Sequence, residues 1–245
     1  MATPRFYCPI PLPLNETIAL PDNVAHHASR ALRLREGDEI VLFDGKHGQY
    51  HAELLFTNGK AMAAIKHYNA QEHELKGKIT LVQGLPSGDK MDWIIEKASE
   101  LGVQHLIPVQ AERSVLNLTG SRLEKRQDHW EKVAISAGEQ CGRNRILQIE
   151  PLQTLARFVA DHPQPDNKLL CHPEGGTDLV AYLKARPDIK EICLIVGPEG
   201  GWSDRELDLL KKNGARQITY GSRILRTETA GLALTAACSA LMDWV

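Results

Sequence analysis

The pattern of hydrophobic and polar positions changes character near residue 75. Before that point the chain carries short apolar runs separated by turn sequences such as Asn58-Gly59. Asn-Gly and Asp-Gly favour tight turns because such turns need positive φ angles. The runs cover residues 39–43, 48–56 and 61–66. Short strands at this spacing predict a small β-barrel.

One short helix is expected within this first part, between Pro21 and Leu34. Its apolar residues at helical spacing are Val24, Ala28, Ala31 and Leu32. The stretch 70–77 that follows the last run is polar and has no period, as a linker does. We therefore expect a first domain over residues 1–74 and a second over residues 77–245.

The second part alternates between buried-type strands and amphipathic helices. Strands are expected at 79–83, 103–109, 168–171, 191–196 and 216–220. Helices are expected at 89–101, 121–141, 203–213 and 229–244, the second and third opened by capping boxes at Ser121 and Ser203. This alternation predicts an α/β fold in which helices cover a parallel sheet.

Composition places the chain among ordinary globular proteins. It has 245 residues, of which 42% are hydrophobic and 24% charged. No apolar stretch reaches the roughly 20 residues of a membrane span, and no secretory signal is recognisable, so a soluble cytoplasmic protein is expected. The five cysteines form no C-x-x-C pair, which favours a reducing compartment and gives no indication of a metal site.

The distribution of charge is more informative than the net charge of −2. Residues 113–145 hold 7 basic and 4 acidic side chains, and residues 211–228 hold 5 basic and 1 acidic. Exposed charges are screened beyond a Debye length of about 8–10 Å, so a phosphate responds to such local excesses. Solvated helix faces would produce the same counts, and charge alone leaves both readings open.

Two loops of the second part have the composition of a ligand site. Open parallel sheets bind ligands at the carboxyl ends of their strands. After Val196 comes the glycine-rich loop 197–203, which lacks the pattern of a P-loop or a dinucleotide fingerprint. After Tyr220 comes the polar loop 221–229, which carries Arg223 and Arg226. A tight strand-to-helix turn and an ordinary surface arginine pair remain alternatives.

Four motifs carry a resemblance to a known family. They are Gly197-Pro-Glu-Gly-Gly, Arg223-Ile-Leu-Arg-Thr-Glu-Thr, Glu96-Lys-Ala-Ser-Glu-Leu-Gly and Glu139-Gln-Cys-Gly-Arg-Asn-Arg. Together they resemble the ribosomal RNA small subunit methyltransferase E family of the SPOUT superfamily. Arg5-Phe-Tyr and Arg30-Ala-Leu-Arg also match, so the resemblance covers nearly the whole chain.

The resemblance implies a fold, an activity and partners. The first domain would be a PUA-like β-barrel that binds RNA, and the second a SPOUT domain with a C-terminal trefoil knot. The protein would act as a homodimer, without a metal. It would transfer a methyl group from S-adenosylmethionine to N3 of one uridine in the 16S rRNA of the small ribosomal subunit.

Roles for individual residues follow from this expected activity. Arginine stays protonated in proteins, so it cannot remove the N3 proton. Its role would be to stabilise negative charge on a uracil carbonyl, with Arg226 as the first candidate and Arg223 as the second. Glu199 or Glu228 would accept that proton, or Glu199 would position the cofactor and Glu228 cap its helix. The cofactor site is expected to include His172, Val196, Gly197, Glu199, Gly200, Gly221, Leu225, Arg226, Thr227 and Thr229. RNA contacts are expected from Arg5, Arg30, Arg33, Arg113, Arg143 and Arg145.

Two other functions stay open from sequence alone. One is a non-catalytic RNA-binding or ribosome-assembly factor that retains the fold, although the polar loop 221–229 has little use in such a protein. The other is a SPOUT relative acting on tRNA or on a ribose 2′-hydroxyl. Binding of S-adenosylmethionine distinguishes the first of these from an enzyme.

Overall fold

The computed structural model describes residues 3–162 and 167–245, which divide into two compact units. The first unit extends to Glu74 and also includes Gly138–Ile146. The second comprises Leu75–Ala137 and Leu147–Val245. The predicted second domain, residues 77–245, includes residues 138–146, whereas in the structure this segment, with the last residues of α3, belongs to the first unit.

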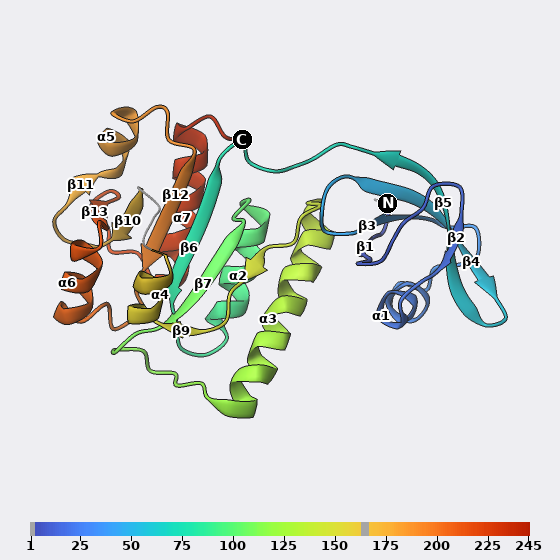
Figure 1. Cartoon of the computed structure of the whole chain (residues 1–245), viewed down its shortest axis with the longest axis horizontal. Helices are drawn as coiled ribbons and strands as arrows, with labels where there is room; N and C mark the ends of the chain where they lie inside the picture. Colours follow the sequence, from blue (N-terminus) through green and yellow to red (C-terminus); the bar gives the residue numbers. More distant parts are fainter. Residues whose placement is uncertain (1–2, 163–166) are drawn as a thin grey trace. The chain divides into compact units, whose positions relative to one another are not determined.

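A five-stranded sheet forms the first unit (Figure 1). Its strands are β1 (Arg5–Tyr7), β2 (Thr17–Ala19), β3 (Glu39–Phe43), β4 (Gln49–Thr57) and β5 (Lys60–Asn69), in the order β1-β3-β4-β5-β2. The β4–β5 hairpin turns at Asn58 and Gly59, whose φ angles are 51° and 76°. Positive φ at both positions is what the Asn-Gly signal predicts.

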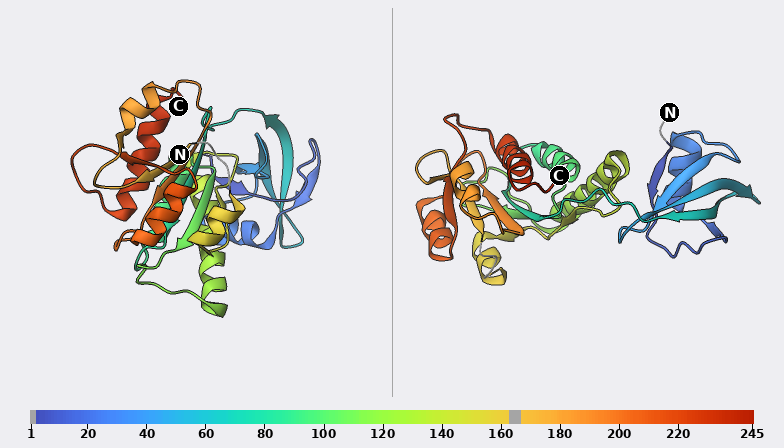
Figure 2. Two further views of the ribbon diagram at one scale, coloured as in Figure 1. Left: turned by 60° about the vertical axis from the view of Figure 1, so that its left-hand side comes forward. Right: turned by 90° about the horizontal axis from the view of Figure 1, so that it is seen from above.

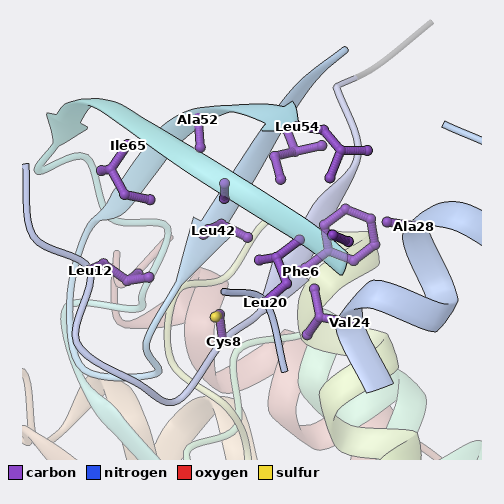
Figure 3. Packing of buried hydrophobic residues seen from close by; sticks show 13 residues of the cluster. Phe6, Cys8, Leu12, Leu20, Val24, Ala28, Leu42, Ala52, Leu54 and Ile65 are labelled. Atoms are coloured by element: carbon purple, nitrogen blue, oxygen red, sulfur yellow. The ribbon is translucent and has the colours of Figure 1, made fainter. Parts of the chain in front are cut away.

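The core of the first unit lies between one face of this sheet and a short helical segment (Figure 3). That segment consists of α1 (Asp22–His26) and a π-helical turn, η1 (His27–Ala31). Val24 and Ala28 are buried as expected, but Ala31 is exposed and Leu32 is 45% exposed. The amide of Leu32 donates to His27 O, five residues back. The wider π turn rotates Ala31 and Leu32 away from the core, so that of these four apolar residues Val24 and Ala28 face it.

An eight-stranded sheet with parallel pairing is the centre of the second unit. The strands are β6 (Lys78–Gly84), β7 (His105–Gln110), β8 (Gln148–Ile149), β9 (Gln153–Thr154), β10 (Lys168–Cys171), β11 (Thr177–Asp178), β12 (Glu191–Val196) and β13 (Arg216–Thr219). Their order is β11-β13-β10-β12-β6-β7-β8, with β9 also paired to β7. Because the strands are parallel, the loops after β10, β12, β13, β6 and β7 emerge at one edge.

Helices cover both faces of this sheet (Figure 2, right). The helices after β6 are α2 (Lys90–Glu100), α3 (Gly120–Cys141), α4 (Leu155–Asp161), α5 (Leu179–Lys184), α6 (Asp204–Lys212) and α7 (Thr227–Leu241). On one face α7 packs on β6 and β12 and contacts α2. On the other, Phe158 of α4 and Leu210 of α6 join a buried cluster with Val82 of β6. The α/β fold with a parallel sheet is therefore confirmed.

The residues at which three helices begin determine the positions of the polar side chains near their first turns. Ser203 caps α6 with the predicted capping box, its partner being Glu206. Helix α3 begins one residue earlier than expected, so Ser121 lies inside it and does not cap it. Helix α7 begins at Thr227, not Thr229, because Arg226 already adopts the extended conformation of a cap residue. Thr227 and Glu228 therefore belong to the first turn of α7 and not to the preceding loop.

Two smaller expectations concern cysteines and membranes. All five cysteines are free thiols. No helix in the described ranges combines the length and apolar content that crossing a membrane requires.

Candidate active site

A cavity of about 540 Å³ opens at the carboxyl-terminal edge of the second sheet. Segments after β10, β12 and β13 line it, namely residues 171–173, 196–202, 219–221 and 223–227, together with Arg113 and Ala230. The two loops singled out in the sequence thus meet at one cavity. Of the predicted site residues, those in its wall are His172, Val196, Gly197, Glu199, Gly200, Gly221, Arg223, Leu225, Arg226 and Thr227.

Thr229 does not belong to the cavity wall. It is exposed on the first turn of α7, and its amide donates to Arg226 O at 2.9 Å. The early start of the helix turns this side chain away from the loop. The structure therefore does not support Thr229 as a cofactor contact.

The glycine-rich loop is held close to the neighbouring strand. A side chain at Gly84, the last residue of β6, would place its Cβ 2.5 Å from Pro198 Cδ. Gly201 has a φ of 67°, which side chains rarely tolerate. From the other side, Arg113 Nη1 donates to Trp202 O at 3.2 Å and lies 3.5 Å from Gly200 O. Arg113, expected among the RNA contacts, thus also fixes this loop.

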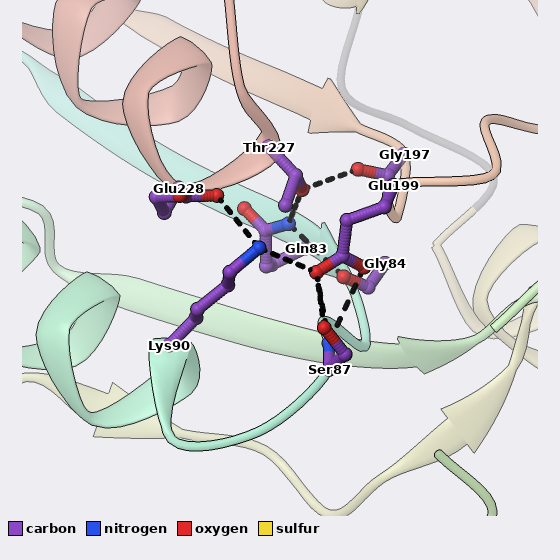
Figure 4. Close-up of polar contacts among 8 residues, drawn as sticks. All are labelled: Gln83, Gly84, Ser87, Lys90, Gly197, Glu199, Thr227 and Glu228. Carbon is purple, nitrogen blue, oxygen red and sulfur yellow. Dashed lines mark hydrogen bonds and ion pairs between the residues drawn. The ribbon is translucent and has the colours of Figure 1, made fainter. Parts of the chain in front are cut away.

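A buried hydroxyl joins the start of α7 to the same loop (Figure 4). Thr227 Oγ1 donates to Gly197 O at 2.5 Å and accepts from Gln83 Nε2 at 2.9 Å. Gln83 is fully buried near the end of β6, and Thr227 is 7% exposed. The pair therefore links β6, the loop after β12 and the first turn of α7 through hydrogen bonds shielded from water.

Lys90 connects the two acidic residues that were expected as alternative proton acceptors (Figure 4). Its Nζ lies 2.8 Å from Glu199 Oε1 and 3.5 Å from Glu228 Oε2. Glu199 also accepts hydrogen bonds from the amide of Ser87 at 3.1 Å and from its hydroxyl at 2.7 Å. The hydrogen bond to Glu199 raises the pKa of Lys90, which stays protonated. A single ammonium group thus joins α2, the loop after β12 and α7.

These contacts change the chemistry available to Glu199. Burial raises the pKa of its carboxyl, but the hydrogen bonds from Lys90 and Ser87 outweigh burial and lower it to about 2. A carboxylate this acidic is a weak base at neutral pH, far from the range that favours proton transfer. The geometry favours a role for Glu199 in holding its loop rather than in accepting a proton.

The arginines at the cavity are free to act on a ligand. Arg223 and Arg226 are exposed and line the cavity. Within the residues that the structure describes, neither guanidinium makes a hydrogen bond or ion pair. Between them Ile224 is 81% exposed. Two unpaired cationic groups beside an exposed apolar side chain are suited to a polar, flat substrate that covers the opening.

The cavity fits a nucleoside-sized cofactor such as S-adenosylmethionine. Its volume lies in the usual range for small-molecule sites, and Val196, Trp202 and Leu225 supply apolar walls. Trp202 is 4% exposed, and its buried Nε1 has no hydrogen-bond partner among the described residues. An unpaired buried donor in a cavity wall is readily explained by a ligand that accepts from it. Burial raises the pKa of Cys171 to about 11, so this thiol stays neutral there.

The other arginines expected to contact RNA divide into two groups. Arg30, Arg33 and Arg145 are exposed. Arg143 is 3% exposed, and its Nη2 lies 2.7 Å from Glu74 Oε2. Arg5 donates to Asn144 Oδ1 at 2.9 Å and is also bonded to Gln49. Because their donors serve the interior of the first unit, the structure does not support Arg143 and Arg5 as RNA contacts.

Ser87, Lys90 and Gln83 were missed in the sequence, although a usable signal existed. Gln83 and Ser87-Gly-Asp-Lys90 stand at and just after the end of β6, which is the same criterion that selected the other two loops. Trp202 lies within the glycine-rich loop 197–203, but no sequence pattern indicates that its indole nitrogen is unpaired.

Comparison with known proteins identifies the family. The family model of the RNA methyltransferase domain matches residues 73–239, and that of the RNA methyltransferase PUA domain matches residues 20–65. A ribosomal RNA small subunit methyltransferase E from Bacillus subtilis (strain 168) is 31% identical over 232 residues, which cover 91% of this chain and 90% of that protein. The chain belongs to the ribosomal RNA small subunit methyltransferase E family.

Solved structures agree with membership of the methyltransferase E family. The crystal structure of the family member from Neisseria gonorrhoeae, bound to S-adenosyl methionine, has a TM-score of 0.90 and 36% identity, with 100% of both chains covered. A protein from Legionella pneumophila, in complex with the same cofactor, has a TM-score of 0.88 and 29% identity over 99% of this chain and 98% of that one. The predicted family and the PUA-like nature of the first domain are confirmed.

Proposed function

We propose that this protein is an S-adenosylmethionine-dependent methyltransferase that modifies N3 of one uridine in 16S rRNA. The observation that carries the proposal is the single cavity at which the loops after Val196 and Tyr220 meet. The names of the relatives give the RNA class, and two similar structures contain the cofactor.

The cofactor is held, in this proposal, mainly by backbone and apolar groups. The loops at 197–201 and 221–226 offer amides and carbonyls, and Val196, Leu225 and Trp202 enclose the adenosine part. When bound, S-adenosylmethionine supplies an electrophilic methyl group on its sulfonium. Four residues support the site without contacting the cofactor. Thr227 and Gln83 tie the glycine-rich loop to α7 and β6, and Lys90 and Ser87 tie it to the start of α2 through Glu199.

Arg226 and Arg223 act on the substrate base. Uracil N3 carries a proton at neutral pH, and its loss places negative charge on the flanking carbonyl oxygens. A guanidinium at the cavity stabilises that charge, which is the kind of contribution that oxyanion donors make. Both arginines have their donors free for this purpose within the described structure.

Glu228 is the better candidate for accepting the N3 proton. Its carboxylate is contacted by Lys90 at 3.5 Å, whereas Glu199 accepts hydrogen bonds from two groups of Ser87 as well as from Lys90. Its position on the first turn of α7 puts it next to Thr227 of the cavity wall.

Further features belong to the proposal through the family resemblance. The PUA-like unit binds RNA, with Arg30 and Arg33 exposed for this role. The second unit contains a trefoil knot in its C-terminal chain and forms a homodimer in the cytoplasm, where the rRNA is. Trp93 of α2 is 53% exposed and Leu241 of α7 is 41% exposed, on two helices that pack together. Exposed large apolar groups of this kind are suited to a partner subunit.

The decisive experiment maps N3-methyluridine in 16S rRNA from cells with and without this protein. A mark that disappears with the protein and returns with the purified protein, S-adenosylmethionine and small subunits supports the proposal. Calorimetry with S-adenosylmethionine tests the alternative of a non-catalytic RNA-binding or assembly factor. RNA binding without cofactor binding would favour that alternative.

A further inference from the structure

Helix α3 carries opposite charges on opposite sides of its first turns. Arg122, Lys125, Arg126 and His129 are spaced by three and four residues and share one face, which we name the α3 basic stripe. The acidic residues of the same turns are Glu124, Asp128 and Glu131, and at about 100° per residue they lie on the other side. Charged side chains that served solubility alone would not be sorted into a basic and an acidic side of the helix.

A surface groove follows the α3 basic stripe. It has a volume of about 490 Å³ and is lined by the four stripe residues and Ser121. The stripe extends about 10 Å along the helix at 1.5 Å per residue, which is enough for more than one phosphate. The groove is distinct from the cavity at the strand ends, with which it has no lining residue in common.

Two members of the stripe are held by acidic residues of α2 and its cap. Arg126 Nη1 lies 3.2 Å from Asp89 Oδ1 and 3.9 Å from Asp92 Oδ1. His129 Nε2 lies 2.7 Å from Asp92 Oδ2. These contacts orient the two side chains and compensate the charge of Arg126.

The other two members are unpaired. Arg122 and Lys125 are exposed, and neither has an ion-pair partner in the part of the chain that the structure describes. They leave the groove with a net positive charge. A polyanion can pair with both without displacing Asp89 or Asp92.

The stripe is connected to the cavity through the first turn of α2. Asp89, which holds Arg126, stands between Ser87 and Lys90, and both of these bind Glu199 of the cavity loop. All of these residues belong to the second unit. Arg126 of the stripe is thus linked, through Asp89, to the same segment whose Ser87 and Lys90 shape the site.

We propose that the α3 basic stripe binds backbone phosphates of the RNA strand that flanks the target nucleotide. The occupant is named as RNA because the inference rests on the proposed function. The stripe contributes affinity without specifying sequence, as phosphate contacts do.

The test compares two double variants of the full-length protein. R122Q/K125Q removes the two unpaired charges of the stripe. K184Q/K190Q removes two exposed lysines elsewhere in the second unit and serves as the matched control. Affinity for a 16S rRNA transcript is measured over a series of potassium chloride concentrations, and affinity for S-adenosylmethionine is measured by calorimetry.

The stripe variant should reduce the slope of log affinity against log salt by about 2, since each lost phosphate contact lowers it by about 1. The control should keep the wild-type slope, and both variants should bind S-adenosylmethionine as the wild type does. A wild-type slope in R122Q/K125Q, or an equal reduction in both variants, would overturn the inference.

The readouts separate this inference from the proposed function. If the wild-type protein methylates 16S rRNA and the stripe variant binds and methylates equally well, the stripe proposal fails and the function stands. If the wild-type protein shows no methylation but the slope falls only in R122Q/K125Q, the function fails and the stripe remains an RNA-binding surface.

Discussion

The arginines of the two units illustrate two uses of the same side chain. In the first unit Arg143 is 3% exposed and bonded to Glu74 through Nε at 3.0 Å and Nη2 at 2.7 Å. In the second, Arg223 and Arg226 are exposed at the wall of a cavity, with no hydrogen bond or ion pair within the described residues. All three stand in motifs of the family. Their partners, not their motifs, distinguish a structural from a functional arginine.

The difference has a physical basis in the five donors of a guanidinium. When carboxylates and carbonyls of the protein fill these donors, the charge is compensated internally and none is left for a ligand. When they are free beside a cavity, the full charge is available to a substrate. Removing Arg143 should therefore affect stability, and removing Arg226 should affect rate.

The largest effect is expected from Arg143→Met. The variant leaves Glu74, whose side chain is 13% exposed, with an uncompensated charge. Breaking such a pair costs about 3–5 kcal/mol, here in the first unit. Denaturant unfolding followed by a probe in that unit measures it. Arg145→Met is the control, because Arg145 is exposed two residues away and should cost less than about 0.5 kcal/mol. Equal losses in the two variants would remove the distinction between buried and exposed arginines.

Arg226→Ala should have the second-largest effect, lowering the methylation rate far more than the affinity for S-adenosylmethionine. Loss of one donor to developing negative charge lowers the rate by about 10²–10³-fold, or about 3 kcal/mol. Single-turnover methylation with saturating RNA and S-adenosylmethionine measures the rate, and calorimetry the cofactor affinity. Arg223→Ala is the comparison, with a smaller loss of rate. If Arg226→Ala weakened cofactor binding as much as it slowed methylation, Arg226 would be a binding residue only.

Thr227→Val tests the hydrogen bonds that support the glycine-rich loop. Without the hydroxyl, Gly197 O loses a donor and Gln83 Nε2 an acceptor inside the protein. A penalty of this kind is about 1–3 kcal/mol, and we expect roughly tenfold weaker binding of S-adenosylmethionine. Thr235→Val is the matched control on the same helix, because its hydroxyl donates only to Gly231 O. Cofactor affinity should be unchanged in the control, and an equal weakening would assign the effect to α7 as a whole.

Much of the second unit was predictable because its signals are local. The buried runs 168–171 and 191–196 became β10 and β12 with the expected bounds, and Ser203 capped α6. The meeting of the two loops followed from parallel strands, whose carboxyl ends share one edge. Neither inference required knowledge of contacts between distant residues.

The unpredicted features depend on long-range contacts. Nothing in the local sequence tells that Arg143 meets Glu74, 69 residues away, while Arg145 stays exposed. The same holds for Lys90 and Glu199, which are 109 residues apart. Periodicity also cannot show that residues 138–146 leave the second unit, since residues 138–141 continue the helical pattern of α3 without a break. The tertiary fold determines which distant residues pair, and the local pattern of a single sequence does not reveal these pairs.

The smallest expected effect concerns the pH dependence of Glu199, a charged group that is paired like Arg143 but only partly buried. Its folded-state pKa of about 2 is below the ordinary value of 4.5. The stabilisation is therefore complete above pH 4.5 and is lost as the pH falls toward 2, where the carboxylate of the folded protein also takes up a proton. Because the side chain is 30% exposed, solvent screening limits the contribution to about 1 kcal/mol.

Glu199→Gln should therefore flatten the curve of unfolding free energy against pH between 4.5 and 2, by about 1 kcal/mol, without altering its shape at neutral pH. Chemical denaturation at a series of pH values measures this difference. Glu53→Gln is the control, since Glu53 pairs with Lys66 on the surface with 39% exposure. A curve for Glu199→Gln that keeps the wild-type slope would mean that Lys90 and Ser87 do not hold the loop through this carboxylate. Thr227 would then be the main link between the glycine-rich loop and α7.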